Sequence, residues 1–260
     1  MGGRRGEKRR ISWLWLPVVL AVSAGATTAS ARDAKAVRIA VAANFTEPIK
    51  EIAVPFETST GTKLVLSFGA TGQLYAQITQ GAPFEILIAA DKKTPAKAIT
   101  DGHAVAGTTF TYAIGKLVLF SRTAGLVTGE ATLKDAKFAK IAIANPATAP
   151  YGAAAIEVMQ KAGVYEALQG KIVQGQSIAQ TFQFVDTGNA EVGFVALSQV
   201  AFVKDGSRWV VPGNLHAPIE QDAVLLNPGE KNEAARAFLA FLKGPEAKAV
   251  IAKFGYGTGQ

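Results

Sequence analysis

Short apolar runs alternate along the chain with segments whose apolar residues recur at helical spacing. The runs fall at 37–43, 63–68, 84–90, 112–121, 140–145, 171–175, 191–196 and 207–212. They are apolar throughout rather than alternating, which is typical of strands that are covered on both faces. Helical patterns follow most of them, for example from about Thr46 to the residue before Gly61, and over 72–80. This order predicts an α/β protein with mainly parallel sheets.

Four of the predicted strands end in a small polar loop that leads directly into a helix. These loops read "AANFTEP", "SFGATGQL", "ANPATAPYG" and "QGQSIAQTF", and none contains Arg or Lys. Ligands of open α/β sheets bind beyond the carboxyl ends of strands, where helix starts offer unpaired N–H groups. Four starts at one cleft would bind an anion through neutral donors, among them the Thr71 hydroxyl and the Asn44 side-chain amide. The alternative is ordinary helix capping, which favours the same residue types.

The N-terminal segment has the three parts of a secretory signal peptide. Five Arg or Lys and one Glu precede the apolar stretch "ISWLWLPVVLAVSAGA", and Ala29-Ser30-Ala31 offers a small-residue cleavage site. A membrane anchor is the alternative, but the stretch is shorter than the ~20 residues of a spanning helix. We therefore expect residues 1–31 to be removed near Ala31 and the mature protein to be exported.

The predicted cleavage changes the charge of the chain. The whole sequence carries a net charge of +7, and removal of the segment's five positive charges and one negative charge leaves 7 − 4 = +3. A charge this small does not indicate a nucleic-acid partner. The sequence has no cysteine, which excludes disulfides, thiol catalysis and cysteine-bound zinc.

Several stretches resemble the periplasmic molybdate-binding proteins of ABC transporters. They are "AANFTEP", "SFGATGQLYAQITQGAPFEILIAAD", "YAIGKLVLFS", "NPATAPYG", "GFVALSQV" and "FLKGPEAKAVIAKFGYG", within Val37 to Gly255. The resemblance implies a type II-like periplasmic-binding-protein fold, in which two α/β lobes are joined by two hinge strands. We expect residues 36–112 and 220–260 to form lobe 1 and residues 113–219 to form lobe 2. The crossings should lie near 110–118 and 213–223.

The resemblance also implies which residues contact the oxygens of molybdate. Asn44 would contribute a polar side chain and an amide, and Thr71 a hydroxyl and an amide. Tyr151 and Ile178 would each contribute a backbone amide, so substitutions there should be tolerated better than at Thr71. Some members of the family place a tyrosine hydroxyl where this chain has Ala196, which puts a fifth side-chain donor in doubt.

The implied function is capture of molybdate, and of tungstate, for delivery to a membrane permease with its cytoplasmic ATPase. A monomer without catalytic residues, resident cofactor or nucleic-acid partner is expected. Sulfate- or phosphate-binding proteins of the same fold are the first alternative. Phosphate retains a proton that requires an acceptor, and Glu47 is the only obvious carboxylate that the loops supply. An exported enzyme acting on phosphorylated compounds and a ferric-binding protein are the remaining alternatives.

Other chemically capable side chains have simpler interpretations. Glu47 fits the first turn of a helix, where it interacts favourably with the helix dipole. Asp91 fits the cap of the helix that begins near Lys93. His103 and His216 lie far apart in loop-like sequence, which does not favour a metal site or catalytic triad. Tyr75 and Tyr112 could suggest ferric-ion binding, but core or cleft-wall positions fit them better.

Overall fold

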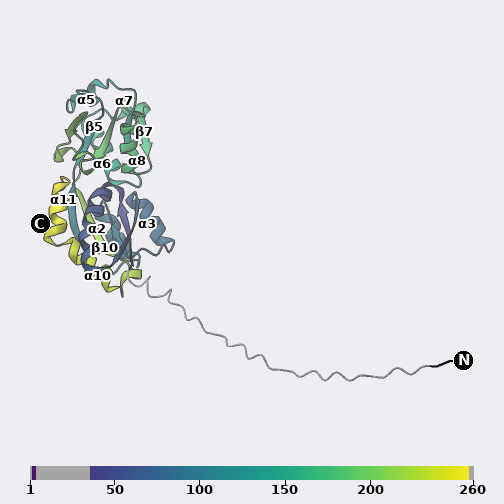
Figure 1. Ribbon diagram of the computed structural model, residues 1–260. Helices are drawn as coiled ribbons and strands as arrows, with labels where there is room; N and C mark the ends of the chain where they lie inside the picture. The colour runs from purple at the N-terminus through teal and green to yellow at the C-terminus, as the bar shows by residue number, and fades with distance from the viewer. Residues whose placement is uncertain (1, 4–35, 258–260) are drawn as a thin grey trace.

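The computed structural model describes residues 2–3 and 36–257. Except for Gly2 and Gly3, the predicted signal peptide lies outside the described residues. Figure 1 shows two lobes, one above the other, with each sheet flanked by helices. Among the described residues, no helix is both long enough and apolar enough to cross a membrane.

The first lobe is built on a sheet with the strand order β2-β1-β3-β10-β4. Its strands are β1 (Ala36–Ala42), β2 (Lys63–Gly69), β3 (Ile86–Ile88), β4 (Phe110–Gly115) and β10 (Ile219–Leu225). β1 pairs in parallel with β2 and β3, whereas β10 runs against β3 and β4. One face carries α2 (Thr46–Thr60), α10 (Glu233–Leu242) and α11 (Pro245–Lys253), and the other carries α3 (Thr71–Thr79) and α4 (Lys93–Thr100). The 3₁₀ turns η1 (Ala43–Phe45) and η4 (Asn227–Gly229) follow β1 and β10.

The second lobe repeats this plan with the strand order β7-β6-β8-β5-β9. Its strands are β5 (Leu117–Ser121), β6 (Ile141–Ala144), β7 (Ile172–Gly175), β8 (Val192–Ala196) and β9 (Ser207–Val210). β6 pairs in parallel with β7 and β8, and β5 runs against β8 and β9. One core contains residues of α5 (Ala131–Asp135), α6 (Pro150–Lys161) and α7 (Tyr165–Leu168), and the opposite face carries α8 (Ile178–Asp186) and α9 (Leu197–Val200). Two 3₁₀ turns complete it, η2 (Gln169–Lys171) and η3 (Gly213–Leu215).

The two-lobe α/β prediction is confirmed, with one strand assignment that needs correction. The apolar run 112–121 is not one strand, because β4 ends at Gly115 and β5 begins at Leu117 in the other sheet. Both parts are mostly apolar, although β4 is only half buried and β5 is buried throughout, so the hydrophobic pattern does not reveal the passage between lobes. The chain returns to the first sheet between β9 and β10. The exact lobe boundaries at 112/113 and 219/220 stay a prediction.

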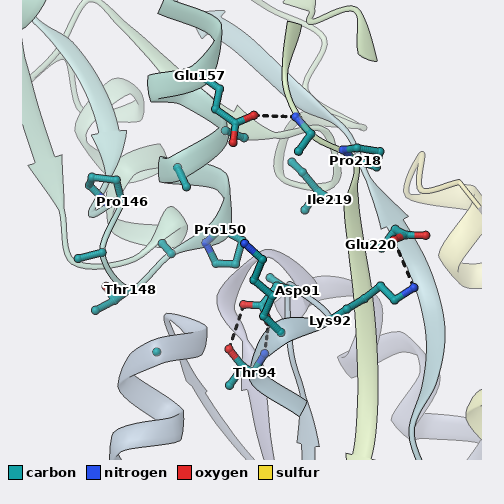
Figure 2. Close-up of a pocket in the computed structure, with 18 residues that line it drawn as sticks. Asp91, Lys92, Thr94, Pro146, Thr148, Pro150, Glu157, Pro218, Ile219 and Glu220 are labelled. Carbon is teal, nitrogen blue, oxygen red and sulfur yellow. Dashed lines mark hydrogen bonds and ion pairs between the residues drawn. The ribbon is translucent and has the colours of Figure 1, made fainter. Parts of the chain in front are cut away.

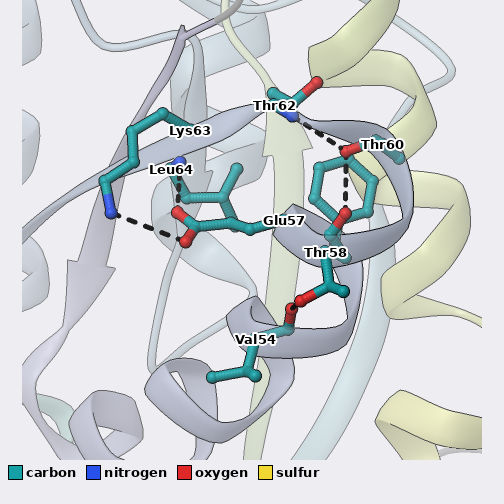
Figure 3. Close-up of polar contacts among 8 residues, drawn as sticks. Val54, Glu57, Thr58, Thr60, Thr62, Lys63 and Leu64 are labelled. Atoms are coloured by element: carbon teal, nitrogen blue, oxygen red, sulfur yellow. Dashed lines mark hydrogen bonds and ion pairs between the residues drawn. The ribbon is translucent and has the colours of Figure 1, made fainter.

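The turn between α2 and β2 fixes where β2 lies (Figure 3). Gly61 ends α2 with a positive φ of 65°, and its N–H donates to the Glu57 carbonyl oxygen at 2.9 Å. The Glu57 carboxylate accepts from the Leu64 N–H at 2.7 Å. These bonds start β2 with Lys63 beside Ala36 of β1, so both strands end at the same edge of the sheet. The helix starts that follow them therefore face the second lobe.

Candidate anion-binding site

Four helical starts meet at one cavity between the lobes. Asn44 follows β1 and Thr71 follows β2, whereas Tyr151 and Ile178 begin the helices after β6 and β7. All four residues line the same cavity, two from each lobe. The structure thus brings the four sequence-predicted site residues together.

The cavity is small and its lining is uncharged. Its volume is about 10 Å³. The lining residues are Ala42, Ala43, Asn44, Gly69, Ala70, Thr71, Ala90, Ala149, Pro150, Tyr151 and Ile178. This lining suits a compact ligand that is held by hydrogen bonds rather than by a charged side chain.

Thr71 is placed to offer two donors. It is 1% exposed and is the first residue of α3, so its N–H has no partner within the helix. Its Oγ1 accepts a hydrogen bond from the Ala90 N–H at 3.0 Å. Because that bond uses Oγ1 as an acceptor, the hydroxyl hydrogen can be donated to a ligand.

Tyr151 and Ile178 offer backbone donors from the second lobe. Pro150 is the first residue of α6 and has no N–H, so Tyr151 provides the first N–H of that helix. Ile178 is the first residue of α8, which follows Ser177 as its N-cap. Neither N–H has an acceptor within its own helix, and the positive end of the helix dipole lies at each.

The side chain of Asn44 differs from the expectation. Asn44 is 2% exposed, and its Nδ2 donates to Gln221 Oε1 at 2.8 Å and to the Tyr256 hydroxyl at 3.0 Å. Both hydrogens of the side-chain amide therefore have partners inside the protein. The geometry does not support donation from this side chain to an anion. The backbone N–H of Asn44, in η1, is the group that remains to donate.

A buried polar network behind the cavity was missed by sequence reasoning. Gln221 bonds Asn44, Tyr112 and Tyr151, at 2.8, 2.9 and 3.0 Å. The Tyr256 hydroxyl donates to the Asn44 carbonyl oxygen at 2.8 Å, as does Ser198 Oγ. The partners of Asn44 in this network are Gln221, Ser198 and Tyr256, and they lie 154 to 212 positions away from it in the sequence. A single sequence carries no signal for such distant pairs.

Burial keeps the tyrosines of this network neutral. It raises the pKa of Tyr112 and of Tyr151 well above the usual tyrosine value, and it also raises the pKa of Tyr256. The network therefore places no phenolate charge beside an incoming anion. Tyr151 is only 2% exposed and its hydroxyl accepts from Gln221, so its side chain has a structural role that the expected backbone contact does not include.

The remaining candidate side chains lie away from the cavity lining. Glu47 is in the first turn of α2, as predicted, and pairs with Lys50 at 2.7 Å on the surface. Asp91 lies one residue before Lys92, which is the N-cap of α4, and its carboxylate accepts from the Thr94 N–H in the first turn at 2.6 Å. Ala196 is fully buried and is not among the residues that line the cavity.

The histidines and the other tyrosine have local partners. His216 Nδ1 lies 2.7 Å from the Ala217 carbonyl oxygen, and His103 packs edge-on against Tyr75. The Tyr75 hydroxyl donates to Asp101 and is separate from the Tyr112 network. Within residues 36–257, no cluster of three or more His, Asp or Glu side chains is placed to hold a metal ion.

A larger groove opens beside the cavity and shares Ala90, Ala149 and Pro150 with it (Figure 2). Its volume is about 620 Å³, and both lobes line it. Several charged side chains of the groove have partners: Lys92 pairs with Glu220 at 3.3 Å, and Glu157 accepts from the Ala217 N–H, while Lys93 also lines the groove. The small cavity, rather than this groove, has the uncharged donors expected of the site.

The lobes also touch directly at the cavity rim. The Gly72 N–H donates to the Thr148 carbonyl oxygen at 2.9 Å, and Gln73 Nε2 donates to Gln176 Oε1 at 3.3 Å. Both bonds join α3 of the first lobe to loops of the second. The structure therefore has the cleft closed.

Comparisons with known proteins agree with this geometry. Residues 37–257 match the family model described as "Bacterial extracellular solute-binding protein". The chain belongs to this family. The solute-binding protein is 54% identical over 244 residues to the molybdate-binding protein ModA of Azotobacter vinelandii, covering 92% of this chain and 96% of that protein. It is 55% identical over 219 residues to ModA of Rhodobacter capsulatus, covering 84% and 87%.

A solved structure has the same fold. The periplasmic molybdate-binding protein of Azotobacter vinelandii superimposes with a TM-score of 0.83 at 39% identity. The match covers 86% of this chain and all of that one. The two-lobe architecture is therefore that of a known solute-binding protein over nearly the whole described chain.

Proposed function

We propose that the protein captures molybdate outside the cytoplasm and delivers it to the permease of an ABC transporter. Tungstate, which has the same charge and tetrahedral shape, is proposed as a second ligand. The oxyanion would contact the N–H groups of Asn44, Thr71, Tyr151 and Ile178 and the Thr71 hydroxyl. The molybdenum is cargo that is reached only through its oxygens, and we expect no resident cofactor.

One observation carries the proposal: helical starts from both lobes converge on a cavity without a charged side chain. Hydrogen bonds to a charged acceptor contribute roughly 1.5–3 kcal/mol each, so several together suffice for tight binding. The high identity to two proteins named molybdate-binding supports molybdate as the ligand.

The alternatives fit less well. Monohydrogen phosphate would need a hydrogen-bond acceptor for its proton, and the cavity lining contains no carboxylate. Sulfate, like molybdate, only accepts hydrogen bonds, but it is smaller. The size of the closed cavity must therefore distinguish the two anions. An enzyme acting on phosphorylated compounds would need a nucleophile with a base or a metal, and the described cavity lining supplies neither.

Titration calorimetry of the mature protein with four anions tests the proposal. Molybdate and tungstate should bind at micromolar concentration or below, whereas sulfate and phosphate at a thousandfold excess should not compete. Sulfate binding as tight as molybdate binding would overturn the assignment.

The proposal has two further parts. The chain would be exported, cleaved near Ala31 and present in the periplasm as a monomer. Its partner would be the transporter's permease with the cytoplasmic ATPase.

A further inference from the structure

Gln221 lies where the two halves of the proposed anion site meet. It belongs to β10, the strand on which the chain returns to the first lobe, and it is 0% exposed. The register of β10 against β4 shifts between Gln221 and Asp222. Such irregularities re-aim side chains relative to the regular alternation of a strand.

The side-chain amide of Gln221 has a partner in each lobe. Its Oε1 accepts from Asn44 Nδ2 at 2.8 Å, and its Nε2 donates to the Tyr151 hydroxyl at 3.0 Å. Asn44 and Tyr151 are cavity-lining residues of the first and the second lobe. A third bond, from the Tyr112 hydroxyl at 2.9 Å, holds the amide from β4. One buried side chain therefore connects the two walls of the cavity.

The other crossing between the lobes makes room for this contact. Gly115 ends β4, and a Cβ there would overlap the Tyr151 hydroxyl and lie 2.5 Å from Gln221 Nε2. The φ of Gly115 is not positive, so the backbone does not require glycine at this position. The space that its missing side chain leaves is what the Gln221–Tyr151 bond occupies.

Building on the proposed function, we propose that Gln221, with the space provided by Gly115, is a positioning residue of the anion site. It holds the Asn44 turn and the start of α6 in the arrangement that presents their N–H groups to one cavity. Because the bond to Tyr151 crosses from one lobe to the other, opening the cleft breaks it. Gln221 and the anion therefore stabilise the same closed form.

The first test removes the amide with Gln221→Leu and measures the Kd of molybdate by calorimetry and its release rate by stopped-flow fluorescence. We expect affinity to fall about tenfold or more, mainly through faster release. Tyr151→Phe removes the bond by which Gln221 reaches the second lobe and leaves its bonds to Asn44 and Tyr112 in place. The double variant should bind no more weakly than Gln221→Leu alone, because both substitutions break the same connection.

The second test leaves every hydrogen-bonding group in place. Gly115→Ala should weaken molybdate binding by displacing the Tyr151 hydroxyl. Gly213→Ala is the matched control. Gly213 lies on the crossing between β9 and β10, and no atom lies within 4 Å of the added Cβ. This pair keeps the proposal testable if Gln221→Leu fails to fold.

A third control separates stability from positioning. Thr132→Val removes a buried hydroxyl that accepts from the Thr128 N–H in the second lobe, away from the cavity. It should lower the melting temperature and leave the Kd unchanged. Wild-type Kd and release rates in both Gln221→Leu and Gly115→Ala would overturn the positioning role. Failure of the wild-type protein to bind molybdate would instead overturn the proposed function.

Discussion

At the scale of single residues, the position of Thr71 explains how the site could donate a side-chain hydrogen bond to the proposed anion. Its hydroxyl oxygen accepts from Ala90, another residue of the cavity lining, and its hydrogen is left for a ligand. The same oxygen thus fixes the rotamer of Thr71 and aims the donor. The Thr71 hydroxyl therefore does more than cap a helix, because its partner, the Ala90 N–H, lies outside α3.

Thr71→Val should weaken molybdate binding about 10- to 100-fold, because it removes a hydrogen bond to a charged acceptor. Thr71→Ser keeps the hydroxyl and should bind within a few-fold of the wild type. Calorimetry of both variants provides the comparison. Equal affinities for Val and Ser would show that the hydroxyl does not contact the anion.

Asp222, next to Gln221, makes the stability of the protein depend on pH. Burial is the main cause that raises the pKa of its carboxyl group, and the Thr111 hydroxyl, which donates at 2.6 Å, partly opposes this shift. A carboxyl group with a raised folded-state pKa favours the protonated form. Its contribution to stability is therefore present at low pH and is lost as the pH rises through the folded-state pKa.

Asp222→Asn should therefore gain stability relative to the wild type as the pH rises above about 4, the ordinary pKa of an aspartate side chain. The asparagine can still accept from Thr111 and does not ionise. Urea unfolding of both proteins across this range measures the difference. A relative loss of stability in the variant as the pH rises would contradict the assignment.

Single residues also show what the sequence could and could not predict. The strand-end loops that carry Thr71 and Ile178 were predictable, because strand ends and helix starts are local patterns, whereas the choice of Ile178 within its loop came from the family resemblance. The bonds of Gln221 to Asn44 and Tyr151 span 177 and 70 positions, so no local pattern reveals them. For the same reason, the side-chain partners of Asn44 and Tyr151 could not be read from their own loops.

At the scale of elements, the start of α3 forms part of the contact between the lobes. A Cβ on Gly72 would lie 3.1 Å from Thr148 Cα and 3.2 Å from its carbonyl oxygen. That is closer than ordinary van der Waals contact with a backbone that belongs to the other lobe. The absence of a side chain at Gly72 therefore allows the cleft to close.

Gly72→Ala should have opposite effects on the two forms of the protein. Alanine favours the helix by up to about 1 kcal/mol over glycine, so the ligand-free protein should be no less stable. The closed form should be hindered by Thr148, so molybdate affinity should fall several-fold. Gly170→Ala, where an added Cβ meets nothing, is the control. Unfolding and calorimetry should separate the two effects, and unchanged affinity would show that closure does not depend on this contact.

The elements themselves were largely predictable from hydrophobic pattern. The predicted helix from Thr46 to the residue before Gly61 is α2, which ends at Thr60. The pattern failed where β4 passes into β5, because both strands are apolar and only one residue separates them. The identity of the sheet that a strand joins depends on its neighbours, which lie far away in the sequence.

At the scale of the whole molecule, few hydrogen bonds hold the rim of the cleft closed. The two at the start of α3 contribute only about 0.5–1.5 kcal/mol each in proteins generally. A ligand that bonds helix starts of both lobes adds several more, and so can shift the equilibrium between open and closed forms. Binding and closure are then one event, which fits a carrier that releases its ligand when the lobes separate.

The most direct test of the central claim is a crystal structure of the molybdate complex, with molybdenum located by anomalous scattering. The account predicts a peak in the cavity, with the oxygens bonded to the Thr71 hydroxyl and to the N–H groups of Asn44, Thr71, Tyr151 and Ile178. No charged side chain should contact the anion. A peak in the neighbouring groove, or a lysine or arginine bonded to the oxygens, would contradict it.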